Sequence, residues 1–436
     1  MKRDRDWRRA GAAMCTAALF GLMTQSGVQA RESDQQAALA ASGPAPICVD
    51  KADTSPATRI VACTLAIDAK DLKGRDLAAA HLNRGQAYRA VGDQARASAD
   101  YSAAIKLFDE STKTATLNSN QFMQRGIAHH ALDDTERALS DYDEAIRLDT
   151  GNALAHVDRG ILIATRKADI RKAIGDFDRA LALVPDNVDT LILRGNAYTT
   201  VGENGRALAD LDRAVDLSPE NPRAFMVRGL VNARLGDMQR AFADYNMALS
   251  IDPKYVDALV NRAAIFSMEG NTDKALADLN QAVELQPDHA LANYNRGYAN
   301  FARQDYDTAI ADYSRAIKAD GRMSWAFNNR CLTRMVVGHD LTEALSDCDE
   351  ALKLQPDNVQ TRETRGFVFL KLGEKDIALR EYDTALRSDP DRPLALFGRG
   401  LILVAKGDFK NGETDKSAAR ALMPSVDRQF ASYGLK

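Results

Sequence analysis

Arginine recurs through most of this chain at a nearly constant interval. After a first step of 41 residues, successive members of the series lie 34 or 35 residues apart, and eight of the ten are followed by glycine. A fixed period of this length indicates stacked copies of one supersecondary unit, and it disfavours a globular core that encloses an active site. The ten positions are Arg84, Arg125, Arg159, Arg194, Arg228, Arg262, Arg296, Arg330, Arg365 and Arg399.

One period of the series, residues 222–255, predicts two short helices. Its second half carries apolar residues at steps of four, three and three over residues 241–251, which is typical of one face of an amphipathic helix. Gly236 suits a left-handed helix end, and Asp237 can begin the following helix. Pro253 ends the second helix because proline cannot continue a helix interior. Each period is therefore predicted to be a helix–turn–helix hairpin.

The same pattern of small residues and terminal prolines repeats ten times and closely resembles the tetratricopeptide repeat. The resemblance implies an all-α fold, a right-handed superhelical solenoid of helix–turn–helix repeats. We expect ten repeats over residues 78–424, with an insertion at about residues 112–118 and one extra residue in the turns of repeats three and eight. The repeats are predicted to start near Ala78, Ser119, Ala153, Val188, Pro222, Val256, Ala290, Ser324, Val359 and Pro393.

The first thirty residues differ from the rest of the chain. A basic stretch precedes an apolar run and the small-residue site Val28-Gln29-Ala30, which predicts a cleaved secretory signal over residues 1–30. The alternative is an ordinary N-terminal helix. The apolar run is short for a bilayer span, so we expect no stable membrane span after cleavage.

The remaining boundaries follow from composition. Residues 31–46 are rich in Ala, Gln, Ser and Pro and are predicted to form a flexible leader. Residues 47–77 resemble a degenerate N-terminal repeat, and residues 425–436 are predicted to form a capping helix, which solenoid ends require. The net charge is −4, of which the first thirty residues contribute +3, so the remainder carries −7. A mildly acidic body gives no electrostatic reason to expect a nucleic-acid partner.

An acidic series accompanies the arginines. It stands one residue before the aromatic or apolar position of each second helix. We predict one partly buried Arg–carboxylate pair per repeat, because the planar guanidinium can hold a carboxylate through two hydrogen bonds. Pairing within a repeat and pairing between neighbours both remain open. An arginine row that binds a substrate is the alternative, but the acids would neutralise it. The acids are Asp100, Asp141, Asp176, Asp210, Asp244, Asp278, Asp312, Asp347, Glu381 and Asp415.

Four cysteines remain once Cys15 has left with the signal. They form two local pairs, Cys48 with Cys63 and Cys331 with Cys348. Within its repeat, Cys331 takes the small position and Cys348 the aromatic position, so the two should face each other within disulfide reach. We predict two disulfides, which suit an exported protein. Buried free thiols are one alternative; a metal site is a poorer one, because no C-x-x-C pair is present.

The segment from Arg330 to Cys348 is similar to one shared by exported bacterial tetratricopeptide repeat proteins, and so is the ending from Phe397 to Leu435. This resemblance implies a periplasmic or secreted protein. In the wider family, first helices line a concave face and bind partner peptides. The Lys/Asn set that holds a carboxy-terminal carboxylate in chaperone-binding relatives is missing, so we do not expect that ligand.

Aromatic residues gather on the first helices of repeats seven to ten. They are candidate anchors for a partner segment in the concave groove. The alternative is that they pack neighbouring first helices, or pack against the chain after Pro424. The candidates are Tyr294, Tyr298, Phe301, Trp325, Phe367 and Phe397.

No catalytic motif accompanies these features. The six histidines are scattered, and no P-loop, nucleophile elbow or zinc-protease motif is present. We therefore expect no enzyme activity, cofactor or metal. The sequence predicts a non-catalytic scaffold or adaptor that binds a protein or peptide in the periplasm or cell envelope. The alternatives are a glycan- or peptidoglycan-associated module and an accessory subunit of an envelope enzyme.

Overall fold

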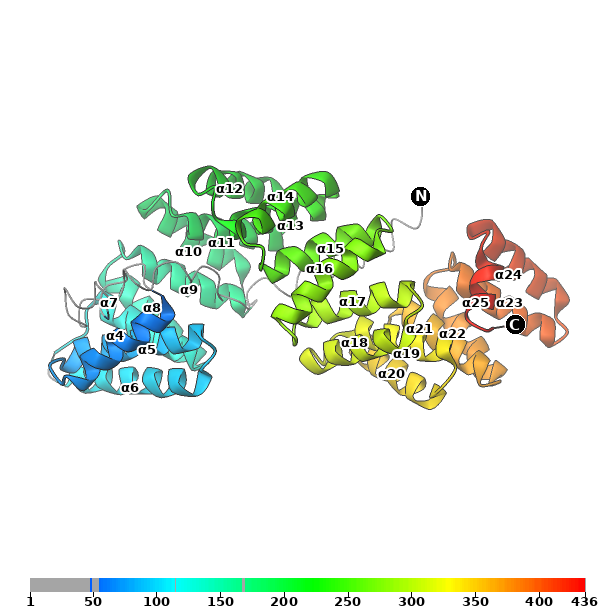
Figure 1. Ribbon diagram of the computed structural model, residues 1–436, viewed down its shortest axis with the longest axis horizontal. Helices are drawn as coiled ribbons and strands as arrows, with labels where there is room; N and C mark the ends of the chain where they lie inside the picture. Colours follow the sequence, from blue (N-terminus) through cyan, green and yellow to red (C-terminus); the bar gives the residue numbers. More distant parts are fainter. Residues whose placement is uncertain (1–47, 49–54, 114, 167–168, 436) are drawn as a thin grey trace. The chain divides into compact units, whose positions relative to one another are not determined.

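The computed structural model describes Cys48 and residues 55–113, 115–166 and 169–435 (Figure 1). The expected signal and leader lie outside these residues. The described part of the chain contains 22 helices and no strand. Consecutive helices pair as antiparallel hairpins, which confirms the prediction of an all-helical array of tetratricopeptide repeats.

The chain divides into two compact units, Met1–Tyr255 and Val256–Lys436. The helices of the N-terminal unit are α4 (Pro56–Asp68), α5 (Gly74–Ala90), α6 (Gln94–Thr112), α7 (Ser119–Ala131), α8 (Thr135–Leu148), α9 (Ala153–Thr165), α10 (Ile170–Leu183), α11 (Val188–Thr200), α12 (Asn204–Leu217), α13 (Pro222–Leu235) and α14 (Met238–Ile251).

The C-terminal unit continues with five hairpins and one short final helix. Its helices are α15 (Val256–Met268), α16 (Thr272–Leu285), α17 (Ala290–Ala302), α18 (Tyr306–Ala319), α19 (Ser324–Val337), α20 (Leu341–Leu354), α21 (Val359–Lys371), α22 (Lys375–Ser388), α23 (Pro393–Ala405), α24 (Phe409–Leu422) and α25 (Val426–Ser432).

The turn inside the hairpin of repeat five follows from two residues. Gly236 ends α13 in the left-handed region, with φ of 86°. The next residue, Asp237, then accepts a hydrogen bond from the backbone N–H of Arg240, 3.0 Å away, and so caps α14. Because this pair both stops one helix and starts the next, the chain reverses within a few residues.

The glycine that follows most of the periodic arginines lets the two helices of a hairpin approach closely. A Cβ atom added to Gly229 would lie 2.6 Å from Cε1 of Tyr245, which is itself almost fully buried. Any larger side chain at this position would force the helices apart. The glycine and the aromatic residue opposite it therefore form the centre of the hairpin core.

Two of the expected irregularities take a specific form. The second helix of the first full repeat, α6, has 19 residues where most second helices have 14. The residues inserted after repeat one therefore begin with a longer helix, and α6 includes Thr112. In repeat three, residues 166–169 separate α9 from α10, which is one residue more than the turn between α7 and α8.

Each periodic arginine binds carboxylates through separate nitrogen atoms. In repeat four, Nε and Nη2 of Arg194 each donate to Asp210 at 2.7 Å, and Nη1 donates to Asp178 of the preceding repeat, also at 2.7 Å. These hydrogen bonds raise the pKa of the Arg194 side chain. The arginine therefore joins two helices of its own hairpin and also reaches the hairpin before it.

We call the complete series the arginine–carboxylate ladder. The inner acid lies in the same repeat as its arginine in all ten cases, and both pairing modes left open by the sequence occur. Nine arginines hold an inner aspartate through two nitrogen atoms, whereas Arg365 holds Glu381 through Nη2 alone. The outer acids, from the preceding repeat, are Asp109, Asp143, Asp178, Asp212, Asp349 and Asp383.

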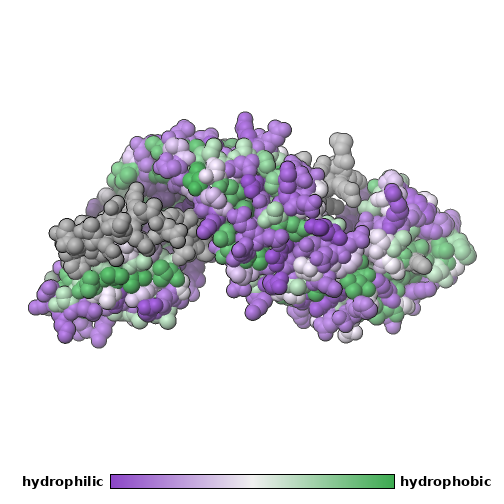
Figure 2. Space-filling model, in the orientation of Figure 1, coloured by the Kyte–Doolittle hydropathy of each residue, from purple (hydrophilic) through white to green (hydrophobic). Residues whose placement is uncertain are grey.

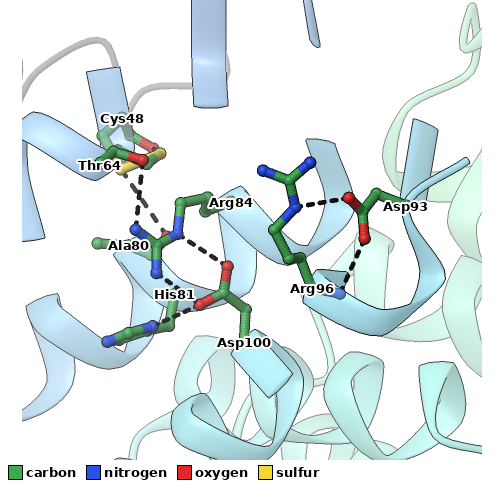
Figure 3. A network of polar contacts seen from close by, with 9 residues as sticks. Cys48, Thr64, Ala80, His81, Arg84, Asp93, Arg96 and Asp100 are labelled. Atoms are coloured by element: carbon green, nitrogen blue, oxygen red, sulfur yellow. Dashed lines mark hydrogen bonds and ion pairs between the residues drawn. A yellow bond between two sulfur atoms is a disulfide. The ribbon is translucent and has the colours of Figure 1, made fainter. Parts of the chain in front are cut away.

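The first rung of the ladder joins the repeat array to the N-terminal cap. Arg84 donates to Asp100 through two nitrogen atoms, and its Nη1 reaches Thr64 of α4 at 3.3 Å (Figure 3). Nδ1 of His81 lies 2.8 Å from the same carboxylate. Burial acts to raise the pKa of Asp100, but the hydrogen bonds from Arg84 and His81 outweigh it and leave the pKa below the ordinary value.

The two ends of the array differ in how their surfaces are covered. On α4, Val61 and Leu65 are about half exposed and lie one helical turn apart. Figure 2 shows the hydrophobic strip over this helix. At the other end, α25 buries Val426 and Phe430 against the C-terminal unit. The last repeat therefore has an apolar cover, whereas part of the outer face of α4 remains exposed.

The ladder predicts a large difference between two acidic residues. Replacing the buried Asp244 by Ala leaves Arg228 without its inner carboxylate, and removing one partner of a buried pair costs about 3–5 kcal/mol. Glu269→Ala, at an exposed position, should change the free energy of unfolding by less than about 0.5 kcal/mol. Thermal unfolding of the two variants compares them directly, and equal shifts in Tm would contradict a stabilising ladder.

Candidate partner-binding site on the first helices

Two disulfides lie at the cysteine pairs that the sequence predicts. Cys48 is bonded to Cys63, and Cys331 to Cys348, with Cα atoms 4.7 and 5.6 Å apart. All four residues are fully buried. Cys331 occupies the position of the core glycine and Cys348 that of the aromatic residue opposite it. The second disulfide thus replaces the central packing contact of its hairpin with a covalent bond.

The fifth position of each first helix is largely taken up by packing. In the C-terminal unit, Tyr294, Asn328, Glu363 and Phe397 are each at most 5% exposed. These side chains lie where a partner would be expected to bind, but they contact neighbouring helices instead. At the ninth position, Tyr298, Leu332 and Leu401 are half-buried. Phe367, the ninth residue of α21, is buried.

Two of the six aromatic candidates lie under the last helix. The ring of Phe367 on α21 lies 5.5 Å from that of Phe430 and 5.9 Å from that of Tyr433, measured between centroids. Phe397 on α23 lies 4.8 Å from Phe430. Helix α25 therefore folds back onto the first helices of repeats nine and ten and covers this part of the candidate surface.

A lysine fixes the end of the chain in that position. Nζ of Lys371 donates to the backbone carbonyls of Met335 and Tyr433 at 2.7 and 3.1 Å. It therefore connects the end of α19, the end of α21 and the chain after α25. Burial lowers the pKa of the Lys371 side chain.

The other four candidates lie on α17 and α19. Tyr294 packs edge-on against Trp325, with centroids 6.4 Å apart, and its hydroxyl accepts a hydrogen bond from Asn329 at 3.0 Å. Tyr298, Phe301 and Trp325 are half-buried. The six aromatic residues therefore form two groups, one covered by α25 and one partly open to solvent.

The indole nitrogen of Trp325 is a notable feature of the open group. Nε1 is buried and has no hydrogen-bond partner among the described residues. An indole nitrogen can only donate, and buried donors are usually paired.

The sequence offered packing against the chain after Pro424 as an alternative, but it did not identify the residues that make three contributions to this region. Phe430 and Tyr433 occupy the face of α21 and α23, Lys371 anchors them, and a buried ion pair joins Glu363 to Arg392 at 3.1 Å. The three-residue spacing of Phe430 and Tyr433 is the only local signal for the first of these. Nothing in the repeat period indicates which helices they contact.

The described residues offer neither a candidate metal site nor a helix fit to span a membrane. Within them, no group of His, Cys, Asp or Glu side chains could hold a metal ion. None of the described helices combines the length and the apolar character that a membrane span requires.

Comparisons with known proteins agree on the repeat. Models of the tetratricopeptide repeat match residues 78–110, 192–256, 269–323 and 364–421. The Cut9–Hcn1 hetero-tetramer of the APC/C contains a similar chain, with a TM-score of 0.50 at 15% identity over 90% of this chain and 98% of that one. At this identity the likeness concerns the fold alone.

Curated relatives match a shorter stretch. The photosystem I assembly protein Ycf3 of Prochlorococcus marinus is 34% identical over 83 residues, which is 18% of this chain and 48% of the relative. The Ycf3 protein of a Synechococcus strain is 38% identical over 81 residues, or 17% and 47%. This chain thus spans about half the length of the curated relatives it matches.

The contact between α25 and the first helices predicts a specific loss of stability. Phe430→Ala removes a ring that packs against Phe367 and Phe397, and truncating a buried Phe costs about 3–5 kcal/mol. Asp427→Ala, in the same helix but on its exposed side, should change stability little. Both are measured as changes in the unfolding of the C-terminal unit. A Phe430→Ala variant as stable as the parent would show that α25 adds nothing to that unit.

Proposed function

Because this chain is a tetratricopeptide repeat protein, we propose that it is a non-catalytic scaffold or adaptor of the bacterial periplasm or cell envelope. In this proposal it holds a helical segment of a partner protein on the first helices of its C-terminal unit. Tyr298, Phe301 and Trp325 are the anchoring residues.

One observation carries the proposal: the chain already packs a helix onto this face. Phe430 of α25 lies against Phe367 on α21 and Phe397 on α23. Tyr433, the residue after α25, also packs against Phe367. The half-buried aromatics on α17 and α19 offer the same chemistry one or two repeats earlier. Aromatic anchors in a helix-binding groove supply much of the affinity in such complexes.

The compartment is part of the same proposal. The basic and apolar composition of residues 1–30 supports export. The two buried disulfides support a compartment in which cysteines are oxidised.

The curated relatives support the class of function and not a particular partner. They are named as assembly proteins, and bringing components of a complex together is a scaffold activity. The aligned segment is less than a fifth of this chain, so their assembly target is not carried over. A glycan-associated module and an accessory subunit of an envelope enzyme remain alternatives, which the experiment below separates.

Affinity capture tests the proposal. A tagged full-length chain, with its own leader, should be recovered from the exported fraction together with a stoichiometric partner protein. Tyr298→Ala/Trp325→Ala should lower recovery of that partner at least about tenfold, because hot-spot aromatics each contribute about 2 kcal/mol or more. Phe409→Ala provides a matched control, since this exposed aromatic on α24 lies outside the proposed site.

Three outcomes would overturn the proposal. Equal partner recovery by the double variant would remove the aromatic site. Retention of the chain on protein-free cell-wall material, with no stoichiometric protein, would favour the glycan alternative. Recovery of the tagged chain in the cytosolic fraction alone would reject export.

A further inference from the structure

In most rungs of the ladder, Nη1 of the arginine meets an outer aspartate of the preceding repeat, as Arg365 meets Asp349 at 2.7 Å. Two rungs of the C-terminal unit have a neutral outer partner, and the first is Arg296, whose Nη1 donates to Oδ1 of Asn280 at 3.3 Å. The second is Arg330 in repeat eight, whose Nη1 donates to the hydroxyl of Ser314 at 2.9 Å. Arg330 therefore has a neutral outer partner, and Ser314 also donates to the Ile310 carbonyl.

The inner carboxylates near this position are shared among additional cations. Asp312 is fully buried and accepts hydrogen bonds from both Arg296 and Arg315. Asp347 accepts from both Arg330 and Arg334. The nearest further acid, Glu343, lies 3.8 Å from Arg334 and is mostly exposed. These four arginines are therefore matched by three acids, Asp312, Asp347 and the exposed Glu343, which leaves one positive charge uncompensated.

The equivalent surface one repeat later has a different charge balance. A groove between α20 and α21 is lined by acids and bases together, including Asp349, Glu350, Lys353, Arg362 and Arg365. Asp357 adds another acid in the turn that follows α20. This later surface is close to electrically neutral.

The corresponding positions between α18 and α19 lie 35 residues earlier and carry four cations with no acid. We call this the α18–α19 surface. Arg315 and Lys318 lie three residues apart on one face of α18 and are exposed. Asp320, which lies between Lys318 and Arg322 in the sequence and accepts a hydrogen bond from the backbone N–H of Arg322, lowers the net charge from +4 to +3. The surface consists of Ser314, Arg315, Lys318, Arg322, Phe327 and Arg330.

We propose that the α18–α19 surface binds an acidic segment of a partner protein. The cations are distributed along α18, through the turn and onto α19, so several carboxylates can be met at once. A single small anion would reach only one or two of these cations. Phe327 lies beside Arg330, with the guanidinium carbon 5.8 Å from the ring centroid, and offers an apolar contact to the same segment. This site is separate from the aromatic residues proposed above, so an experiment can reject one of the two proposed sites and leave the other standing.

The test uses the full-length chain and a fluorescently labelled peptide of eight glutamates. A peptide of eight glutamines is the neutral control. The parent should bind the acidic peptide, with an affinity that falls as salt rises, and should not bind the glutamine peptide. The triple variant Ser314→Asp/Arg315→Glu/Arg322→Asp places acids at the positions that are acidic in the groove between α20 and α21. It should weaken binding of the acidic peptide at least tenfold. Arg179→Glu, the same charge reversal at the matching position of repeat three, should leave binding unchanged.

The reverse exchange provides a gain of function. Asp349→Ser/Glu350→Arg/Asp357→Arg should create a second site and raise the binding stoichiometry from one peptide to two. Thermal unfolding confirms that each variant is folded. Undiminished binding by the charge-reversed variant would overturn the proposal. Displacement of the peptide by equimolar inorganic phosphate would also overturn it, because that result would indicate an unselective anion site.

Discussion

A single side chain, the periodic arginine, links three helices of the array. Its guanidinium group has five N–H donors in a fixed plane, so it can hold one carboxylate through two bonds and still reach another. In repeat four it joins α11 to α12 through Asp210 and reaches α10 through Asp178. The inner pair requires arginine and its acid at a nearly constant offset in every repeat, which explains why the period of the sequence is so regular.

The ladder also determines where function can reside. An arginine that holds two carboxylates has little positive charge left for a ligand, so the regular rungs are structural. What remains is the set of positions that differ between repeats. In the C-terminal unit these are the aromatic residues on α17 and α19 and the cations of the α18–α19 surface, where Ser314 replaces the outer acid of Arg330. Both lie on or beside first helices, and both depend on the rigid array to position them.

The sequence predicted the features that repeat, and it predicted less well the features that depend on distant contacts. The period identified the hairpins, and aligning one repeat with another paired Cys331 with Cys348, because each position has a fixed place in its hairpin. The burial of Tyr294 and Glu363 was not apparent, since it arises from neighbouring repeats stacking on them. The fold-back of α25 was foreseen only as one alternative, because Phe430 and Phe367 lie far apart in the chain and follow no shared period.

Repeat nine offers the most direct test of the ladder, because Glu381 replaces aspartate there. Arg365 donates only one hydrogen bond to Glu381, at 2.7 Å, and both Nε of Arg365 and Oε2 of Glu381 are buried without a hydrogen-bond partner. A buried polar group without a partner costs about 1–3 kcal/mol, whereas removing one methylene costs about 0.8 kcal/mol. Thermal unfolding of Glu381→Asp should therefore show a gain of about 1 kcal/mol, and the mirror variant Asp210→Glu should show a loss. A Glu381→Asp variant less stable than the parent would contradict the claim that two-point pairing of arginine with aspartate stabilises the array.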